Sequence, residues 1–149
     1  MIKKIIKLDI PYLIKGSAVK DEKGSVSFVN DFDFPRIKRF YVIDIKTEGI
    51  IRAWHGHRRE VKYAFAVSGK ALVGAANIDN WKNPSRKSKV YNFLLSSKKP
   101  AILYIPKGYA NGFKSLTNNT KLIFFSKHTL EQSKKDDIRF DAKYWDIWD

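Results

Sequence analysis

The stretch from residue 49 to residue 69, GIIRAWHGHRREVKYAFAVSG, contains two of the three histidines of the chain, His55 and His57. Four basic residues stand close to them, at positions Arg52, Arg58, Arg59 and Lys62. The β-branched and aromatic residues on either side, IKRFYVIDI and VKYAFAV, predict strands. Imidazoles held between strands beside fixed positive charge suit proton transfer on an anionic substrate, and they also suit metal binding.

Outward from this stretch, the chain continues in short strand-like segments. Such segments are predicted within residues 1–20 and at 24–35, 37–45, 50–57, 61–69, 70–79, 90–96, 101–106 and 120–128. Gly69 is expected to start a hairpin, and KGYANGF (107–113) is expected to form a turn. Residues 131–149 predict a short helix or a packed aromatic tail. Nine or ten strands with little helical periodicity predict an all-β sandwich or barrel.

Composition limits the class of protein. With 149 residues, 44% hydrophobic and 14% aromatic, the chain can bury a core and is not a disordered sequence. The absence of cysteine excludes disulfides and thiolate sites and is compatible with a cytoplasmic location. The N-terminal apolar run is interrupted by Lys7, Asp9 and Pro11, so neither a signal peptide nor membrane insertion is expected. We therefore expect one domain over residues 1–149.

The net charge of +14 has two interpretations. One is a solvated, lysine-rich surface, and the other is an anionic partner such as a phosphorylated metabolite, a nucleic acid or a lipid. The lysines are scattered along the chain rather than gathered in one tail or helix. This scatter argues against dedicated nucleic-acid binding, and we expect no nucleic-acid partner.

The spacing of Gly49, His55, His57, Glu60 and Gly69 resembles the first motif of cupins, which are double-stranded β-helix (jelly-roll) barrels. The segment PKGYAN (106–111) is similar to the second cupin motif, with an amide, Asn111, where that motif has a histidine. In metal-binding cupins this histidine completes the ion's ligands. Because amide oxygens are poor ligands for transition metals, we expect neither a metal nor another cofactor.

From about residue 36 the chain resembles one cupin branch, the dTDP-4-dehydrorhamnose 3,5-epimerase family. RAWH (52–55) is similar to a family segment whose histidine is the catalytic base and whose arginine holds the diphosphate. Lys62 stands where the family has a lysine that stabilises an enolate. IPKGYANGFKSL (105–116) and IRFDAKYWDIWD (138–149) are similar to two further family segments. The resemblance implies a nucleotide-sugar substrate and a homodimer in which strands cross between subunits.

The first half of the chain also resembles a sister group, the dTDP-sugar 3,4-ketoisomerases. IKRFY (37–41) is similar to that group's basic-aromatic strand. The pair His55 and His57 is similar to its histidine-x-histidine motif, whose imidazoles move protons between neighbouring carbons. A 3,4-ketoisomerase is therefore the alternative activity.

The sequence departs from the epimerase pattern at four positions. Thr129 stands where the family has a tyrosine general acid, with His128 beside it. Asn111 replaces a histidine, and Val73 replaces an active-site aspartate. The aspartate that orients the base is matched poorly, with Asp141 one position early. These departures support a rival of another class, a non-catalytic cupin that binds a sugar nucleotide.

The residue chemistry assigns the following candidate roles. A histidine near neutral pH can remove a proton next to the carbonyl of a 4-keto sugar, and a nearby cation can stabilise the resulting enolate. We expect His55 to be the base and Lys62 the cation, with His57, Tyr63, Tyr109, Tyr41 and His128 as candidate second proton donors. The expected substrate-binding residues are Arg52, Arg39, Tyr41, Asn111 and Arg58.

Each of these residues also has a structural interpretation. A strand histidine is often only hydrogen-bonded, and Lys62 is equally compatible with a solvated strand edge. Tyr109 and Asn111 could simply close a tight turn. We expect Trp145 and Trp148 to pack in the core or in an interface, and His128 to lie on the surface. We also expect strand alternation to place His55 and His57 on the same face.

Overall fold

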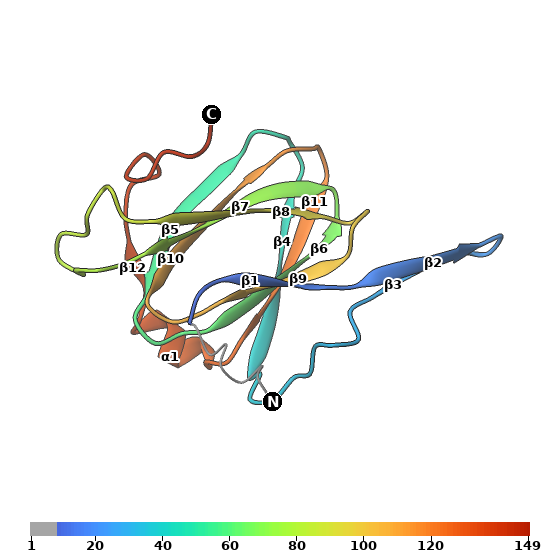
Figure 1. Cartoon of the computed structure of the whole chain (residues 1–149), viewed down its shortest axis with the longest axis horizontal. Helices are drawn as coiled ribbons and strands as arrows, with labels where there is room; N and C mark the ends of the chain where they lie inside the picture. Colours follow the sequence, from blue (N-terminus) through green and yellow to red (C-terminus); the bar gives the residue numbers. More distant parts are fainter. Residues whose placement is uncertain (1–8) are drawn as a thin grey trace.

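The computed structural model describes residues 9–149, which form two five-stranded antiparallel sheets and one short helix (Figure 1). The first sheet has the order β1-β9-β6-β11-β4 and the second β12-β5-β10-β7-β8. Their strands are β1 (Tyr12–Lys15), β9 (Ala101–Ile105), β6 (Lys62–Ser68), β11 (Thr120–Ser126), β4 (Arg39–Ile45), β12 (Ile138–Arg139), β5 (Ile51–His57), β10 (Tyr109–Ser115), β7 (Lys70–Asn77) and β8 (Val90–Ser96). The helix α1 spans Leu130–Lys134. The all-β jelly-roll prediction, with a short helical and aromatic tail, is confirmed.

The interior of the barrel is filled from both sheets by alternate residues of the strands. In β6 the buried positions are Lys62, Ala64 and Ala66, and the residues between them point outward. In β11 the same alternation buries Leu122 and Phe124. One continuous apolar cluster, contributed by both sheets, therefore fills much of the barrel. Buried polar side chains, Lys62 and Ser126 among them, lie where β6 begins and β11 ends.

A second apolar cluster covers the outer face of the second sheet. Trp54, on β5, packs there against Trp145 and Trp148 of the C-terminal segment. Gly74 of β7 has no side chain because a Cβ would come within 2.7 Å of the Trp54 ring. The prediction that Trp145 and Trp148 are packing residues is confirmed, since each is only 3% exposed.

Two local predictions were wrong. Gly69 does not start a hairpin, because β6 belongs to the first sheet and β7 to the second, so the chain crosses between sheets there with φ of +74°. The segment 107–113 is not simply a turn, because Tyr109 begins β10 in the middle of the second sheet. Gly112 serves close packing inside that strand, where a Cβ would lie 2.4 Å from the Cβ of Ala53.

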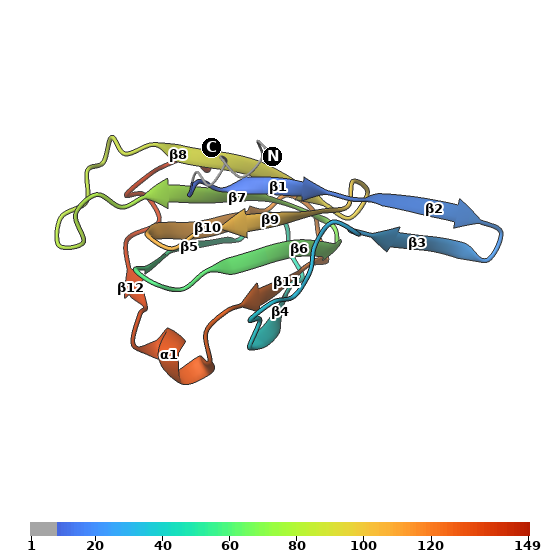
Figure 2. The same cartoon turned by 60° about the horizontal axis from the view of Figure 1, so that its bottom comes forward.

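A two-stranded arm projects away from the barrel, as Figures 1 and 2 show. It consists of β2 (Ser17–Asp21) and β3 (Gly24–Phe28), which pair with each other and with no other described strand. Its valines, Val19 and Val26, are 59% and 62% exposed. The strand predicted within residues 24–35 is this β3, and the part of the predicted opening strand before residue 9 lies outside the described residues. Within residues 9–149, no helix has the length and apolar character needed to cross a lipid bilayer.

Candidate active site

The two histidines of β5 lie opposite two residues of β10. Asn111 pairs with His55 and Tyr109 pairs with His57. Directly opposed residues of an antiparallel pair point to the same side of the sheet, so all four side chains point into the barrel. The prediction that His55 and His57 share a face is confirmed. Tyr109 and Asn111 therefore belong to the same inner face rather than to an isolated turn.

Lys62 and Tyr41 face the histidines from the first sheet. The Lys62 side chain is buried, with its Nζ 5.7 Å from the centre of the Tyr41 ring and 5.9 Å from that of Phe124. Tyr41 stacks on Phe124 with the ring planes 3° apart. The positive charge of Lys62 contributes to lowering the pKa of both His55 and His57, after the larger effect of burial. A cation and two imidazoles thus share one end of the barrel.

The hydrogen bonds of His57 fix its tautomer. Its Nδ1 lies 2.6 Å from the main-chain oxygen of Asp136, and a carbonyl oxygen only accepts, so Nδ1 carries the proton. The opposite nitrogen, Nε2, is buried and has no hydrogen-bond partner among the described residues. Burial and Lys62 hold the pKa of His57 below its ordinary value. The ring is therefore neutral at pH 7, with an unpaired Nε2 lone pair.

His55 faces a carboxylate that comes from the opposite end of the chain. Its Nδ1 lies 3.7 Å from Oδ1 of Asp137, and the other oxygen of Asp137 accepts hydrogen bonds from Arg139 at 3.1 and 3.2 Å. Burial alone would raise the pKa of Asp137, but the hydrogen bonds from Arg139 lower it. Asp137 is thus ionised beside His55. This placement is suited to orienting the imidazole and stabilising its protonated form.

Asp137 was missed by the sequence analysis, which looked for the orienting aspartate around residue 141. Asp141 is exposed, and its side chain accepts the backbone N–H of Lys143 at 2.8 Å. The pairing of Arg139 with His55 in the β12–β5 ladder brings the preceding aspartates to the histidines. The only sequence sign was the pair of acidic residues just before the IRF segment.

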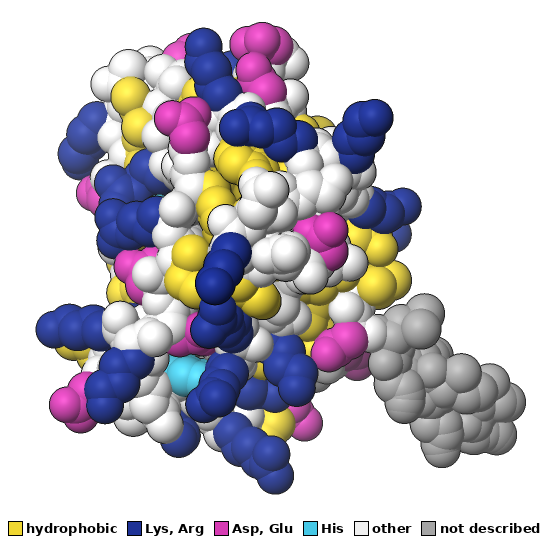
Figure 3. All heavy atoms as spheres, turned by 90° about the vertical axis from the view of Figure 1, so that its left-hand side faces the viewer, with side chains coloured by type: hydrophobic (Ala, Val, Ile, Leu, Met, Phe, Trp, Pro, Cys, Tyr) yellow, Lys and Arg dark blue, Asp and Glu magenta, His cyan; other side chains and the backbone are white. Residues whose placement is uncertain are grey.

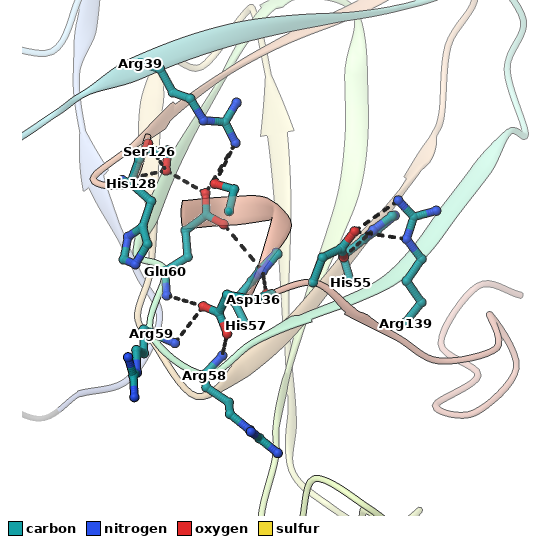
Figure 4. A network of polar contacts seen from close by, with 12 residues as sticks. Arg39, His55, His57, Arg58, Arg59, Glu60, Ser126, His128, Asp136 and Arg139 are labelled. Carbon is teal, nitrogen blue, oxygen red and sulfur yellow. Dashed lines mark hydrogen bonds and ion pairs between the residues drawn. The ribbon is translucent and has the colours of Figure 1, made fainter. Parts of the chain in front are cut away.

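Glu60 lies at the centre of a buried polar network next to His57 (Figure 4). Its Oε2 accepts the Ser126 hydroxyl at 2.5 Å and lies 3.6 Å from the Arg39 guanidinium. Its Oε1 lies 3.4 Å from Nδ1 of His57. Nη2 of Arg39 also donates to the Ser133 hydroxyl at 2.9 Å, whereas its buried Nε has no hydrogen-bond partner among the described residues.

The donor set does not fit a transition-metal site. Glu60, the carboxylate of the metal motif, is engaged by Arg39 and Ser126, and Nδ1 of His57 is bonded to a carbonyl. Across residues 9–149, no three histidine or carboxylate side chains converge in an arrangement that could hold an ion. Asn111 offers an amide in place of a third imidazole.

The candidate arginines lie in different places. Arg52 lines a cavity of about 270 Å³ together with His55, Arg139 and Phe140. Arg58 lines a separate cavity of about 340 Å³ with Arg59, His128, Gln132, Lys135 and Asp136, and its guanidinium lies 5.4 Å from the Trp81 ring. Figure 4 shows Arg58 and Arg59 extending away from His55. The structure therefore brings Arg52 to the histidines, and it places Arg58 apart from them.

The candidate proton donors are separated in the same way. Tyr63 points outward and packs against Phe32 and Tyr104 at 4.9 and 5.4 Å. His128 lines the cavity of Arg58. Inside the barrel remain His57, Tyr41 and Tyr109. Burial, with Tyr91 beside the ring, raises the pKa of Tyr109 to about 12, so its hydroxyl stays protonated at neutral pH.

The positions that depart from the epimerase pattern have structural roles. Thr129 caps the N-terminus of α1, with its hydroxyl accepting from Gln132 N at 3.2 Å and Gln132 bonding back to the Thr129 N–H. Val73 is buried in the apolar interior of the barrel. Neither position provides an acid to the site.

Residues 9–148 match the family described as dTDP-4-dehydrorhamnose 3,5-epimerase. The chain belongs to this family. No sequence in the set of curated proteins matches it.

Solved structures of epimerases and of 3,4-ketoisomerases have the same fold as this chain. The rmlC epimerase of Mycobacterium tuberculosis is 15% identical with a TM-score of 0.74, over 96% of this chain and 76% of that one. The epimerase of Bacillus anthracis, with TDP and PPi bound, is 18% identical with a TM-score of 0.73, over 93% and 84%. A sugar 3,4-ketoisomerase of Thermoanaerobacterium thermosaccharolyticum, in complex with TDP, is 21% identical with a TM-score of 0.69, over 95% and 96%.

The lowered pKa values of the two histidines predict the pH dependence of this family member. A base must be neutral to accept a proton, and burial lowers the pKa of both His55 and His57. We expect kcat/KM to be flat near pH 7 and to fall only below about 6.5, the ordinary pKa of histidine. A pH–rate profile of the free enzyme measures this, and an acidic limb centred above 6.5 would contradict it.

Proposed function

We propose that the chain is an epimerase of the dTDP-4-dehydrorhamnose 3,5-epimerase type, acting on a dTDP-4-keto-6-deoxyhexose by metal-independent proton transfer. The main support is the arrangement of His55 beside the Asp137 carboxylate, with Lys62 facing it across the barrel. This arrangement supplies a base, a partner for the protonated base and a cation for the enolate. The family match supports the substrate class.

In the proposed mechanism His55 removes the proton from the carbon next to the sugar carbonyl. The electron pair of the broken C–H bond moves onto the carbonyl oxygen, and Lys62 stabilises the negative charge that develops there. A second group then donates a proton to the opposite face of the carbon, which inverts it. Tyr109 is the proposed donor, because its hydroxyl stays protonated and its side chain points into the barrel beside His55. The neutral ring of His57 has a lone pair and no proton on Nε2, so we propose His57 as a second proton acceptor.

We propose that Arg52 binds the diphosphate, because it lines the cavity next to His55. Tyr41 offers a ring edge and Asn111 an unpartnered buried Nδ2 to the sugar nucleotide. Arg39 and Arg58 contribute as positive charge at a distance, since Arg39 is bonded to Glu60 and Ser133 and Arg58 lies on a separate cavity. Figure 3 shows a face on which Lys and Arg side chains lie around a histidine, with Asp and Glu side chains elsewhere on the same face. Positive charge around this histidine favours the approach of an anion.

The second candidate activity is a 3,4-ketoisomerase. It is favoured by Thr129, which caps a helix where the epimerases have an acid, and by two neutral inward imidazoles in one strand. In that reaction a proton is removed from C3 and one is delivered to C4, while the hydroxyl proton moves from the C3 oxygen to the C4 oxygen, so that the carbonyl lies at C3. The rival of another class is a cupin that binds the nucleotide without catalysis.

Incubation with dTDP-4-keto-6-deoxyglucose in heavy water distinguishes these functions. We expect deuterium at C3, with a second label at C5 for a 3,5-epimerase. A 3-keto product labelled at C4 identifies the ketoisomerase. Tight dTDP binding without any exchange overturns the enzymatic proposal and leaves the binding module.

We propose that the chain forms a homodimer through the β2–β3 arm. An isolated two-stranded hairpin is marginally stable in water, and this arm exposes Val19 and Val26 away from its own barrel. A second copy of the chain would cover these side chains, and its strands would extend the two-stranded sheet of the arm. We also propose that the enzyme works in the cytoplasm as a single cupin domain, and that it serves cell-surface polysaccharide synthesis.

The dimer proposal predicts the effect of charges on the arm. Val19→Asp together with Val26→Asp is expected to give a monomer, because two carboxylates in an apolar interface would be desolvated without partners. Light scattering after size-exclusion chromatography measures the mass. Lys20→Asp, which changes a charge on the same arm without removing an apolar side chain, is the control and is expected to remain dimeric. A wild-type monomer at micromolar concentration would overturn the proposal.

A further inference from the structure

Asp136 connects the segment before β12 to the residues that follow β5. Its main-chain oxygen lies 2.6 Å from Nδ1 of His57. Its carboxylate accepts the backbone N–H groups of Arg58, Arg59 and Glu60 at 2.8, 2.9 and 2.9 Å. All of these contacts go to four consecutive residues, 57–60. Asp136 therefore holds both the His57 ring and the turn formed by residues 58–60.

The side chain of Asp136 is suited to a permanent, rigid contact. The residue is 9% exposed, and three N–H donors to one carboxylate offset most of the cost of burying its charge. The turn that it holds carries Glu60, whose own carboxylate lies 3.4 Å from Nδ1 of His57. Loss of the Asp136 carboxylate would leave three backbone donors without this acceptor. The turn and the ring above it would then lose their common anchor.

We propose that Asp136 is a positioning residue that fixes His57 in the Nδ1–H tautomer and so reserves Nε2 for proton transfer inside the barrel. The side chain sets the position of the turn, and this position places the main-chain oxygen against Nδ1. The proposal rests on the proposed function, in which Nε2 of His57 accepts a proton. Nothing in the sequence pattern of the family segments pointed to this residue.

The adjacent residue extends the same arrangement to the second histidine. Asp137 lies 3.7 Å from Nδ1 of His55. Two consecutive aspartates therefore lie against the Nδ1 atoms of the two rings, Asp136 at His57 and Asp137 at His55. Each imidazole then has its Nε2 free for the barrel interior. A shift of this two-residue segment would displace both rings together.

The charged groups around His57 come from four elements. Glu60 lies in the turn, Lys62 on β6, Asp136 before β12 and His55 on β5. Burial and Lys62 lower the pKa of His57, while Glu60 and Asp136 act in the opposite direction. Their balance leaves a neutral ring at pH 7, and a neutral imidazole has a choice of two tautomers. The carbonyl of Asp136 decides that choice.

The test compares Asp136→Ala and Asp136→Asn with Asp141→Asn in the full chain. Asp141 is a matched control because it is exposed and its carboxylate also accepts a backbone N–H, that of Lys143, but it makes no hydrogen bond to residues 55–60. The nitrogen NMR shifts of His57 report its tautomer without any substrate. Steady-state kinetics on the 4-keto sugar nucleotide report kcat and KM separately, and circular dichroism reports folding.

In the wild type and in Asp141→Asn we expect His57 to be almost entirely Nδ1–H. Asp136→Ala is expected to show a mixture of tautomers and a kcat about 10- to 100-fold lower with KM nearly unchanged, because a reacting group is displaced. Asp136→Asn keeps one acceptor oxygen and is expected to be intermediate. If Asp136→Ala does not fold, Asp136→Asn decides alone.

Unchanged nitrogen shifts and kcat in the folded variants would overturn the positioning role. A lower kcat with unchanged His57 shifts would also overturn it, because the effect would then not pass through the tautomer. If the wild type transfers no proton at all, the proposed function fails, while the NMR comparison still decides whether Asp136 fixes the ring.

Discussion

His55→Asn is expected to lower kcat by about 10²- to 10⁴-fold, the usual contribution of a general base. Asparagine is close to histidine in size but has no basic nitrogen. It can therefore take up no proton, and the Asp137 carboxylate, 3.7 Å from the imidazole in the wild type, has no protonated base to stabilise. Exchange of the C3 proton for deuterium, followed by NMR, measures the step directly. We expect exchange at C3 to disappear on the time scale of wild-type turnover.

His128→Asn is the matched control for this variant. His128 is the remaining histidine of the chain and lines the cavity of Arg58, away from the barrel interior. The same substitution there is expected to leave kcat within twofold of the wild type. Full exchange activity in His55→Asn would show that another group is the base.

Lys62→Met is expected to lower kcat by about 10²- to 10³-fold, as is typical when a group that stabilises a developing oxyanion is removed. Methionine fills a similar buried volume beside Tyr41 and Phe124, so the aromatic packing is retained. The substitution also removes a positive charge that lowers the pKa of both His55 and His57. Both histidines should therefore titrate at higher pH, and the acidic limb of the rate profile should move upward.

Lys127→Met provides the control for Lys62→Met. The Lys127 ammonium also lies beside an aromatic ring, 5.7 Å from that of Tyr63, but this ring is on the outer face. We expect wild-type kcat and an unchanged pH profile for it. A Lys62→Met enzyme with lower kcat but an unshifted profile would mean that Lys62 does not act on the histidines through its charge.

The strand pattern predicted the inner face of the site because alternation is a local property. With His55 directed inward, His57 must point the same way, and the structure confirms this. The same rule applied to β6 would also have removed Tyr63 from the proton donors, since Lys62 and Tyr63 are neighbours on one strand and point to opposite faces. Local periodicity was thus sufficient for side-chain direction.

Connections between strands could not be predicted in the same way. Gly69 has the positive φ of a hairpin glycine, but in a jelly roll the chain passes from one sheet to the other at this point. The two glycines of residues 107–113 indicated a turn, but only Gly108 has a positive φ, whereas Gly112 lies within β10 and allows close contact with Ala53 of the neighbouring strand. The positions of Asp136 and Asp137 beside the histidines depend on the pairing of β12 with β5. No local sequence pattern encodes a pairing between strands so far apart in the chain.

The dependence of β5 on β12 has a consequence for biosynthesis. His57 and the residue that fixes its ring are 79 positions apart, and a nascent chain emerges with its N-terminal part first. When β4 to β11 have emerged, the barrel can close and His55 and His57 already point inward, but the backbone edge of β5 is still open and neither aspartate has arrived. A ribosome-bound barrel of this kind would hold its histidines without their partners and would expose a strand edge that chaperones or other nascent chains can bind. Maturation of the site would therefore be a separate, late event after the barrel itself has folded.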